Sequence, residues 1–251
     1  MVTAARERFA SLQFPGVRLG ALLAEPVRRV PTGIAALDAL LGGGLPRGHL
    51  SEIVGGPSSG RTALLHALLA SATRRGEATA VVDLLDALDP PSLARAGADL
   101  GRVLWVRPPS PQTALKCAEL ILGAGGFGVV ALDGLGAPAA RPLPRPVWPR
   151  LAQVTRRARA VVALCASRRM TTSCAAVVLR LSQRRVRWGG QLFDGITTTA
   201  EMTRSRFGPA QQAVVLALGE RLAALEGVQI ESWPAGRSGG GEGAVDRAIS
   251  G

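Results

Sequence analysis

The chain has 251 residues with an apolar content of 47%, so it can bury a full hydrophobic core without disulfides or a structural metal. Its formal net charge is +12, and Lys116 is the only lysine, so arginine supplies nearly all of the positive charge. This balance favours nucleic acid or an acidic protein as a partner, the alternative being a compositional preference for arginine over lysine. Tyrosine is absent and aromatic residues make up 4%, which argues against a base-stacking surface.

The N-terminus, the lengths of the apolar runs and the cysteine spacing together indicate the cellular compartment. Residues Met1–Ala10 carry charged side chains and no apolar core of a signal peptide. No apolar run approaches the ~18 residues that a membrane-spanning helix needs. The cysteines are odd in number, widely spaced and flanked by apolar residues, at Cys117, Cys165 and Cys174. We expect free thiols in the cytoplasm, no metal site and no membrane partner.

In chain order, residues 1–30 predict an irregular arm with a short helix near Ala4–Leu12, and residues 31–233 the folded core. Strands and helices are expected to alternate from 50 to 165, which predicts a mainly parallel, twisted α/β sheet with helices on both faces. An antiparallel block is expected to extend one edge, with strands at Ala175–Leu181, Arg185–Trp188, Thr197–Thr203 and Gln212–Leu218. Residues 234–251 are rich in Gly and Ser and predict a disordered tail.

A phosphate-loop pattern lies between the first strand of this core and the following helix. Residues Gly55–Thr62 fit G-x-x-x-x-G-K-[ST], except that Arg61 replaces the lysine. The glycines turn backbone N–H groups toward an anion, but a planar guanidinium cannot place a compact ammonium at the same point. The pattern predicts a vestigial nucleotide site, the alternative being a structural turn without a ligand. The candidate residues are Gly55, Ser58, Ser59, Gly60, Arg61 and Thr62.

Several carboxylates follow predicted strands. The apolar run 127–133 ends in Asp133, at the place of the magnesium-orienting acid beside a phosphate loop. Asp83, Asp86 and Asp89 cluster after the strand 78–83, where we favour solvated acids and helix caps over a metal site.

Over most of residues 30–220 the chain resembles the RecA core. The resemblance is carried by the runs VPTGIAALDALLGGGLPRGHLSEIVGGPSSGRT, LDPPSLARAG, VLWVRPPSPQTALKCAELI and VVALDGLGA. It implies a catalytic glutamate where Leu85 stands, and an adenine-stacking tyrosine where Ser92 stands. It also implies a γ-phosphate-sensing Asn-Gln pair at Ala166 and Ser167. Phosphoryl transfer depends on positioning and electrostatics, so losing several of these groups should leave little activity.

The resemblance also implies where DNA would bind. RecA presents its DNA loops at positions that here carry a proline-rich basic segment, Gly136–Arg150, a basic helix after it, and a shortened loop over residues 168–174. The alternative is a solvated or partner-facing basic surface. The candidate DNA-binding residues are Arg141, Arg145, Arg150, Arg156, Arg157, Arg168 and Arg169.

The shortened core with these departures is similar to the ImuA family of SOS-induced mutagenesis proteins. This resemblance implies a catalytically inactive adaptor in the DNA-damage response and translesion DNA synthesis. Its implied partners are an ImuB-like inactive Y-family polymerase homologue, RecA, DNA and, indirectly, an error-prone C-family polymerase. We expect no catalytic residue and no required cofactor, with ATP and magnesium bound weakly at most. The alternative is a slow DNA-stimulated ATPase or recombination modulator of RecA type.

A final pair of arginines points to a partner. Arg204 and Arg206 resemble the Lys-x-Lys pair with which a RecA subunit reaches the nucleotide of its neighbour. The resemblance implies docking of this chain on the ATP-bearing face of a RecA subunit. The alternative is a pair of solvated strand-end charges.

Overall fold

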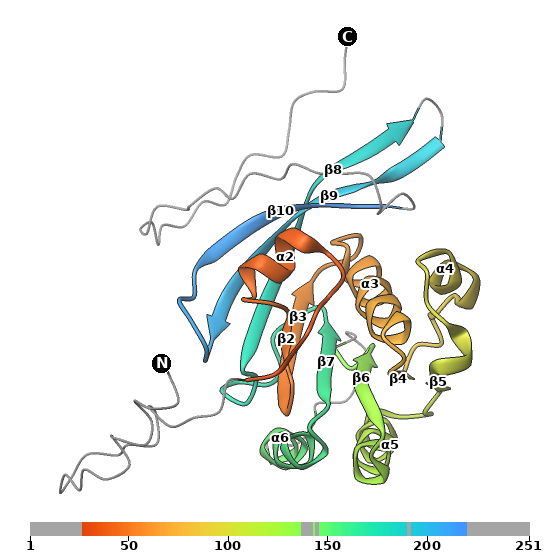
Figure 1. The fold of residues 1–251 in the computed structure, drawn as a ribbon, viewed down its shortest axis with the longest axis vertical. Coiled ribbons are helices and arrows are strands. Elements are labelled where there is room, and N and C mark those ends of the chain that lie inside the picture. The colour runs from red at the N-terminus through yellow and green to blue at the C-terminus, as the bar shows by residue number, and fades with distance from the viewer. Residues whose placement is uncertain (1–26, 137–142, 144–145, 190–191, 220–251) are drawn as a thin grey trace, which may run out of the picture.

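The computed structural model describes residues 27–136, 143, 146–189 and 192–219. Its centre is an eight-stranded sheet in the order β10-β9-β8-β3-β7-β6-β4-β5 (Figure 1). The strands from β8 to β5 in this order are parallel, and β9 and β10 continue the sheet antiparallel. The strands are β3 (His49–Gly55), β4 (Ala78–Asp83), β5 (Val103–Val106), β6 (Phe127–Asp133), β7 (Val161–Ala166), β8 (Val177–Gly189), β9 (Leu192–Ser205) and β10 (Gln212–Leu218). The predicted fold class is confirmed.

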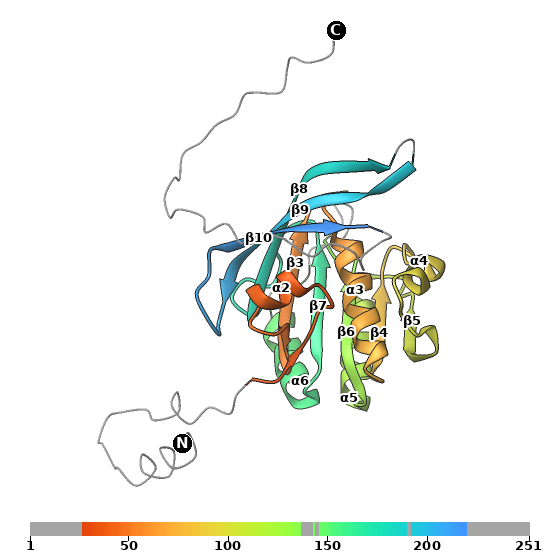
Figure 2. The ribbon, with the colours of Figure 1, turned by 45° about the horizontal axis from the view of Figure 1, so that its top comes forward.

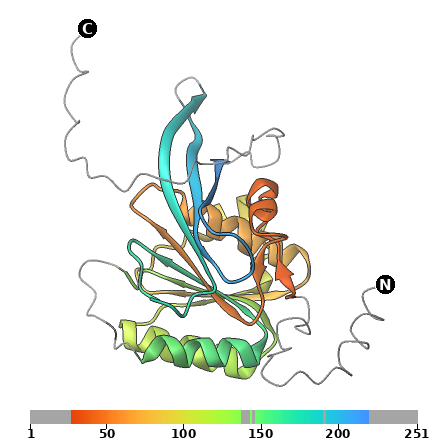
Figure 3. The same cartoon turned by 90° about the vertical axis from the view of Figure 1, so that its left-hand side faces the viewer.

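Helices cover both faces of this sheet (Figure 3). α2 (Ala35–Leu40) and α3 (Arg61–Arg74) lie on one face, and α5 (Pro111–Ala124) and α6 (Val147–Ala158) lie on the other. A short helix, α4 (Pro90–Arg95), packs beside α3, and a 3-10 turn, η2 (Leu100–Arg102), precedes β5. None of the described helices is both long and apolar enough to cross a bilayer.

The helix ends follow local signals in the sequence. Ser110 accepts a hydrogen bond from the Thr113 N–H, which caps α5, and a proline occupies the first turn. Gly76 adopts a φ of 81° just after α3, where a residue with a Cβ is disfavoured. The start of α5 and the end of α3 are therefore set by local sequence.

Two predicted boundaries are wrong. The strands expected at Ala175–Leu181 and Arg185–Trp188 form the single strand β8, which pairs parallel with β3 rather than antiparallel. Residues 182–184 contain neither glycine nor proline, so nothing turns the chain there. The predicted loop 136–150 also contains the start of α6 at Val147. Pro149 is tolerated because the first N–H groups of a helix have no partner within it.

The strands β8 and β9 continue beyond their neighbours as a two-stranded ribbon (Figure 2). β3 pairs with β8 only as far as Leu181, and β10 pairs with β9 from Ile196 onward. At its base this ribbon lies beside the loop that joins β3 to α3, which brings distant parts of the sequence to one site.

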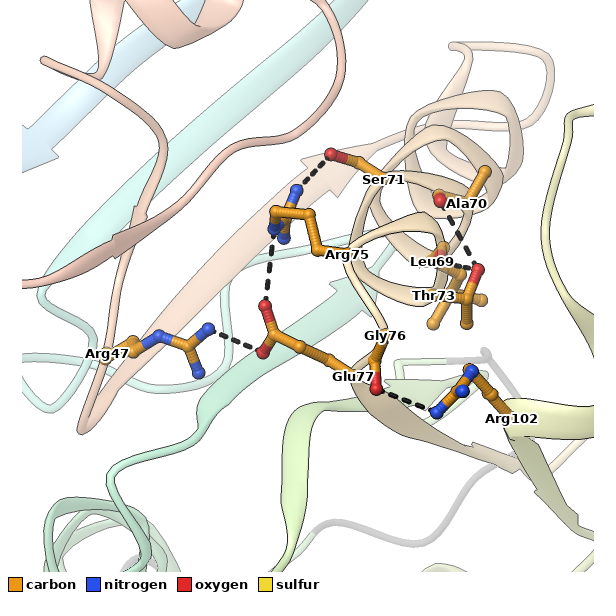
Figure 4. A network of polar contacts seen from close by, with 9 residues as sticks. All are labelled: Arg47, Leu69, Ala70, Ser71, Thr73, Arg75, Gly76, Glu77 and Arg102. Atoms are coloured by element: carbon orange, nitrogen blue, oxygen red, sulfur yellow. Dashed lines mark hydrogen bonds and ion pairs between the residues drawn. The ribbon is translucent and has the colours of Figure 1, made fainter.

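The edge at which the parallel strands begin, here named the amino edge, is held together by an ionic network (Figure 4). Glu77 accepts hydrogen bonds from Arg47 at 2.5 Å and from Arg75 at 3.3 Å. Arg102 donates to the Gly76 carbonyl at 2.8 Å. These arginines join the starts of β3, β4 and β5 to the end of α3, so part of the basic charge has a structural role.

Candidate nucleotide and DNA-binding sites

The loop between β3 and α3 has the backbone shape of a phosphate loop. Ser58 and Gly60 have φ values of 55° and 94°, so the chain turns sharply before α3 begins at Arg61. The φ of Gly60 lies in the region that favours glycine, and a Cβ there would also come within 2.6 Å of Leu218 Cδ1. The Ser59 carbonyl accepts a hydrogen bond of 2.9 Å from Thr198 Oγ1, so β9 supports the loop from behind.

A cavity of about 380 Å³ borders this loop. Its size lies within the range of small-molecule sites, roughly 300–1,000 Å³. Besides the loop residues, its wall contains Gln183, Val186, Ile196, Leu218 and Gly219 from β8, β9 and the end of β10. The sequence did not reveal this apolar wall, because it depends on how distant strands pair.

Asp133 lies near Arg61, as expected for a phosphate-loop site. Burial raises the pKa of the Asp133 carboxyl above its ordinary value. The hydrogen bond from the Gly134 N–H, at 2.8 Å, and the positive charge of Arg61 both oppose that rise in pKa, while Asp83 adds to it. Arg61 and Asp133 thus share the edge at which the parallel strands end, here named the carboxyl edge.

Leu85 occupies the position that the RecA resemblance assigns to the catalytic glutamate. Its side chain is 58% exposed and lies over Gly134, since its Cγ is 2.7 Å from a Cβ built on that glycine. A leucine here offers no acceptor for a water molecule.

The neighbouring aspartates have structural roles. Asp83 is 2% exposed and accepts hydrogen bonds from the N–H groups of Leu85 and Leu88 and from Trp105 Nε1. The expectation that Asp83 is solvated was therefore wrong, because its carboxylate holds the loop after β4. Asp89 caps α4 by accepting from the Ser92 N–H at 3.0 Å. Among the described residues, no three His, Cys, Asp or Glu side chains are grouped to hold a metal.

A second cavity, of about 420 Å³, is lined by three arginines and by no acidic residue. Arg168 and Arg169 follow β7, and Arg180 lies on β8. Val177, Leu179 and Leu181 of β8 pack into the core beneath α3, so the alternation along the strand turns Arg180 to the opposite face of the sheet. We call the cavity that Arg168, Arg169 and Arg180 line the arginine cavity. Arg180 was missed in the sequence because its proximity to Arg168 depends on the pairing of β8 with β3.

Glu52 fixes the loop that carries two of these arginines. The side chain is fully buried in β3, with 0% exposure. Its carboxylate accepts hydrogen bonds from the N–H groups of Met170 and Thr171, at 2.5 and 3.4 Å, and from Thr171 Oγ1 at 2.5 Å. The loop after β7 is therefore anchored to the strand that leads into the phosphate loop.

The other candidate DNA-binding residues do not join the arginine cavity. Arg150, at the start of α6, forms an ion pair of 2.6 Å with Glu119. Arg156 and Arg157 lie in the last turn of α6, about 10 Å further along the helix at 1.5 Å per residue. This turn is near the amino edge, whereas Arg168 and Arg169 follow β7 at the carboxyl edge. Arg141 and Arg145 lie outside the described residues.

Arg204 and Arg206 are held by the main chain that precedes β8. Arg204 donates to the carbonyls of Ala175 and Ser173 at 3.0 and 3.3 Å. Arg206 donates to the Ser173 carbonyl at 2.7 Å. Because an arginine carries five N–H donors, both retain donors for a partner.

Comparison with known proteins identifies the fold family. The family model described as the RecA N-terminal domain matches residues 14–181, more than half of the chain. The chain belongs to the RecA N-terminal domain family. Within this family it is 38% identical to Protein RecA of Arthrobacter sp. (strain FB24) over 122 residues, which make up 48% of this chain and 35% of that protein. Protein RecA of Leifsonia xyli subsp. xyli is 39% identical over a stretch of the same length, 34% of its own chain.

The same fold is found in a solved structure of lower sequence similarity. The crystal structure of the RadB recombinase superposes with a TM-score of 0.60 and 20% sequence identity, and the match covers 76% of this chain and 97% of that one. The RecA N-terminal domain of this chain thus retains the fold with a sequence that has diverged widely. The chain spans about a third of the length of the curated RecA proteins that it matches.

Proposed function

We propose that this chain is a DNA-binding adaptor of RecA fold that does not hydrolyse ATP. It acts in the bacterial cytoplasm, in SOS-induced translesion DNA synthesis, as the resemblance to the ImuA family implies. The main support for the loss of hydrolysis is that Leu85, an exposed apolar side chain, stands where the RecA resemblance places the catalytic glutamate. The arginine cavity supports the DNA-binding part, because three cations without an acid in the lining suit a phosphate backbone.

The site retains groups that would bind the phosphates of a nucleotide, but it lacks a base for their hydrolysis. The N–H groups of the loop and Arg61 would hold the phosphates of ATP, and Thr62 with Asp133 would hold its magnesium ion. Bound ATP would supply a charged ligand that orders this loop. The remaining chemistry lacks a base, because Leu85 cannot accept a proton and the Asp83 carboxylate is occupied by three hydrogen bonds.

We expect no ATP turnover above background, with or without single-stranded DNA. A coupled assay of released phosphate on the purified chain measures this directly. Restoring Arg61→Lys alone is expected to leave the rate at background, because Leu85 and Ser92 remain.

The competing function is a slow DNA-stimulated ATPase, which the intact backbone of the phosphate loop and the retained Asp133 favour. The deciding control is Thr62→Ala, which removes the hydroxyl expected to hold magnesium. A wild-type rate that disappears in this variant would establish the ATPase and reject the adaptor.

The adaptor requires partners, and the amino edge offers a surface for RecA. There Arg204 and Arg206 present donors that could reach the phosphates of a nucleotide held by a neighbouring RecA subunit. An ImuB-like polymerase homologue, and through it an error-prone C-family polymerase, would be recruited by other surfaces of the chain.

Replacing Arg204 and Arg206 together by alanine is expected to weaken co-purification with ATP-loaded RecA at least about tenfold, since charge-assisted contacts are worth roughly 1.5–3 kcal/mol each. The double lysine variant retains both charges and serves as the control for charge, and circular dichroism checks that both variants are folded. Equal binding by wild type and the double alanine variant would exclude this mode of docking.

A further inference from the structure

The helices α5 and α6 lie side by side on the face of the sheet opposite α3 (Figure 3). Residues of both helices line a groove between them. Its volume is about 830 Å³, twice that of either cavity described above. Residues between Lys116 and Gly125, on α5 and its C-cap, line one wall, and Arg150, Val154, Arg157 and Ala158 of α6 line the other. Neither the phosphate loop nor the arginine cavity contributes a residue to it.

The groove has an apolar floor. Leu120 of α5 is 74% exposed, the highest value among the large apolar side chains of the described residues. Leu122, Val154 and Ala158 also line the groove around it. A row of apolar side chains between two helices is the surface that a third, amphipathic helix covers.

The rim of the groove is cationic. Lys116, Arg150 and Arg157 line it, and Glu119 is the one acid among its lining residues. Glu119 pairs with Arg150, and no ion pair within the described residues involves Lys116 or Arg157. An occupant is therefore expected to carry acidic side chains opposite these two cations.

We propose that the groove between α5 and α6 binds an acidic, amphipathic helix of a partner protein. Two or three apolar side chains of the helix cover Leu120 and the floor, and flanking Asp or Glu residues pair with Lys116 and Arg157. A nucleic acid fits this surface less well, because a charged phosphate backbone makes no favourable apolar contact with the exposed leucine at the centre of the groove. The proposal is independent of DNA binding at the arginine cavity and of the state of the nucleotide site.

The test uses the full chain and a phage-displayed library of peptides of about 15 residues, long enough for four helical turns. Selection on the wild-type chain, with counter-selection on Leu120→Glu, is expected to enrich peptides with apolar residues three and four positions apart and several acids. Failure to enrich any peptide overturns the proposal, as does enrichment of acidic peptides that lack the apolar spacing.

The best peptide is then labelled with fluorescein and titrated by anisotropy. Its affinity is expected to fall at least about tenfold in Leu120→Glu and in Arg157→Glu, as for central residues of an interface. Leu100→Glu is the matched control, because it makes the same substitution at another exposed leucine, at 42% exposure, that does not line the groove. This variant should bind the peptide as wild type does.

Two further results decide against the proposal. Unchanged binding by Leu120→Glu would place the peptide elsewhere, and displacement of the peptide by an oligothymidylate would make the groove a nucleic-acid surface. Should Leu120→Glu prove unfolded by circular dichroism, Leu120→Ala replaces it, with a severalfold loss expected because the side chain lies outside the core.

Discussion

Replacing Arg168, Arg169 and Arg180 together by alanine is expected to weaken binding of single-stranded DNA by at least about a hundredfold at low salt. The three guanidinium groups line one cavity whose lining residues include no acid. Glu201 of β9 lies opposite Arg180 in the strand pairing, but no ion pair joins the two in the described part of the chain, so each guanidinium can contact a phosphate. A charge-assisted contact of this kind is worth roughly 1.5–3 kcal/mol. Fluorescence anisotropy with a labelled oligothymidylate measures the affinity, and the slope of log affinity against log salt should decrease in magnitude by about 2.

The matched control removes three arginines from the other end of the sheet. Arg156, Arg157 and Arg159 lie at the end of α6, near the amino edge, and their removal lowers the net charge by the same amount. We expect this variant to bind DNA within about threefold of wild type, as a change in long-range attraction alone would allow. Equal losses of DNA affinity in the two triple variants would mean that DNA binding depends on the net charge of the protein and not on the arginine cavity.

The two triple variants also address a limit of the sequence-based prediction. The basic residues from 150 to 169 are close together in the chain and were treated as one DNA-binding surface. In the structure α6 runs from the carboxyl edge toward the amino edge, and β7 then returns, so Arg157 and Arg168 lie toward opposite ends of the sheet. Proximity in sequence therefore overstated proximity in space.

The parallel part of the fold could be predicted because its signals are local. Apolar runs such as 127–133, glycines after helices, and caps such as Ser110 each specify an element without reference to the rest of the chain. The alternation of apolar and polar residues along a strand is less informative, since it identifies neither the strand that pairs with it nor the residue at which the chain turns. For this reason β8 was divided in two, and its parallel pairing with β3 was not expected.

The same limit applies to the sites. The phosphate loop is contiguous, so its residues were identified from sequence and are brought together in the structure. Leu218, which packs against Gly60, and Arg180, which lies beside Arg168, reach their sites only through strand pairing. Glu52 was missed for a further reason. A carboxylate inside an apolar strand shows no sign, in sequence, of the loop that its oxygens will anchor.

Glu52 carries the second large expected effect. Glu52→Leu is expected to lower the free energy of unfolding by about 3–5 kcal/mol, because it leaves the N–H groups of Met170 and Thr171 and the Thr171 hydroxyl buried without an acceptor. Leucine has a similar volume, so loss of packing contributes little. Since domains are stable by roughly 5–15 kcal/mol, urea denaturation should resolve the change readily.

The structural origin of this effect can be tested with a second substitution. Thr171→Val removes the hydroxyl donor, so adding it to Glu52→Leu should recover about 1 kcal/mol, whereas alone, beside an intact Glu52, it should destabilise by a similar amount. A loss below about 1 kcal/mol in Glu52→Leu would mean that the loop after β7 does not depend on this carboxylate. If the anchor acts as described, DNA affinity of the folded Glu52→Leu variant also falls, because the same loop positions Arg168 and Arg169 in the arginine cavity. Stability and DNA binding would then both depend on one buried side chain.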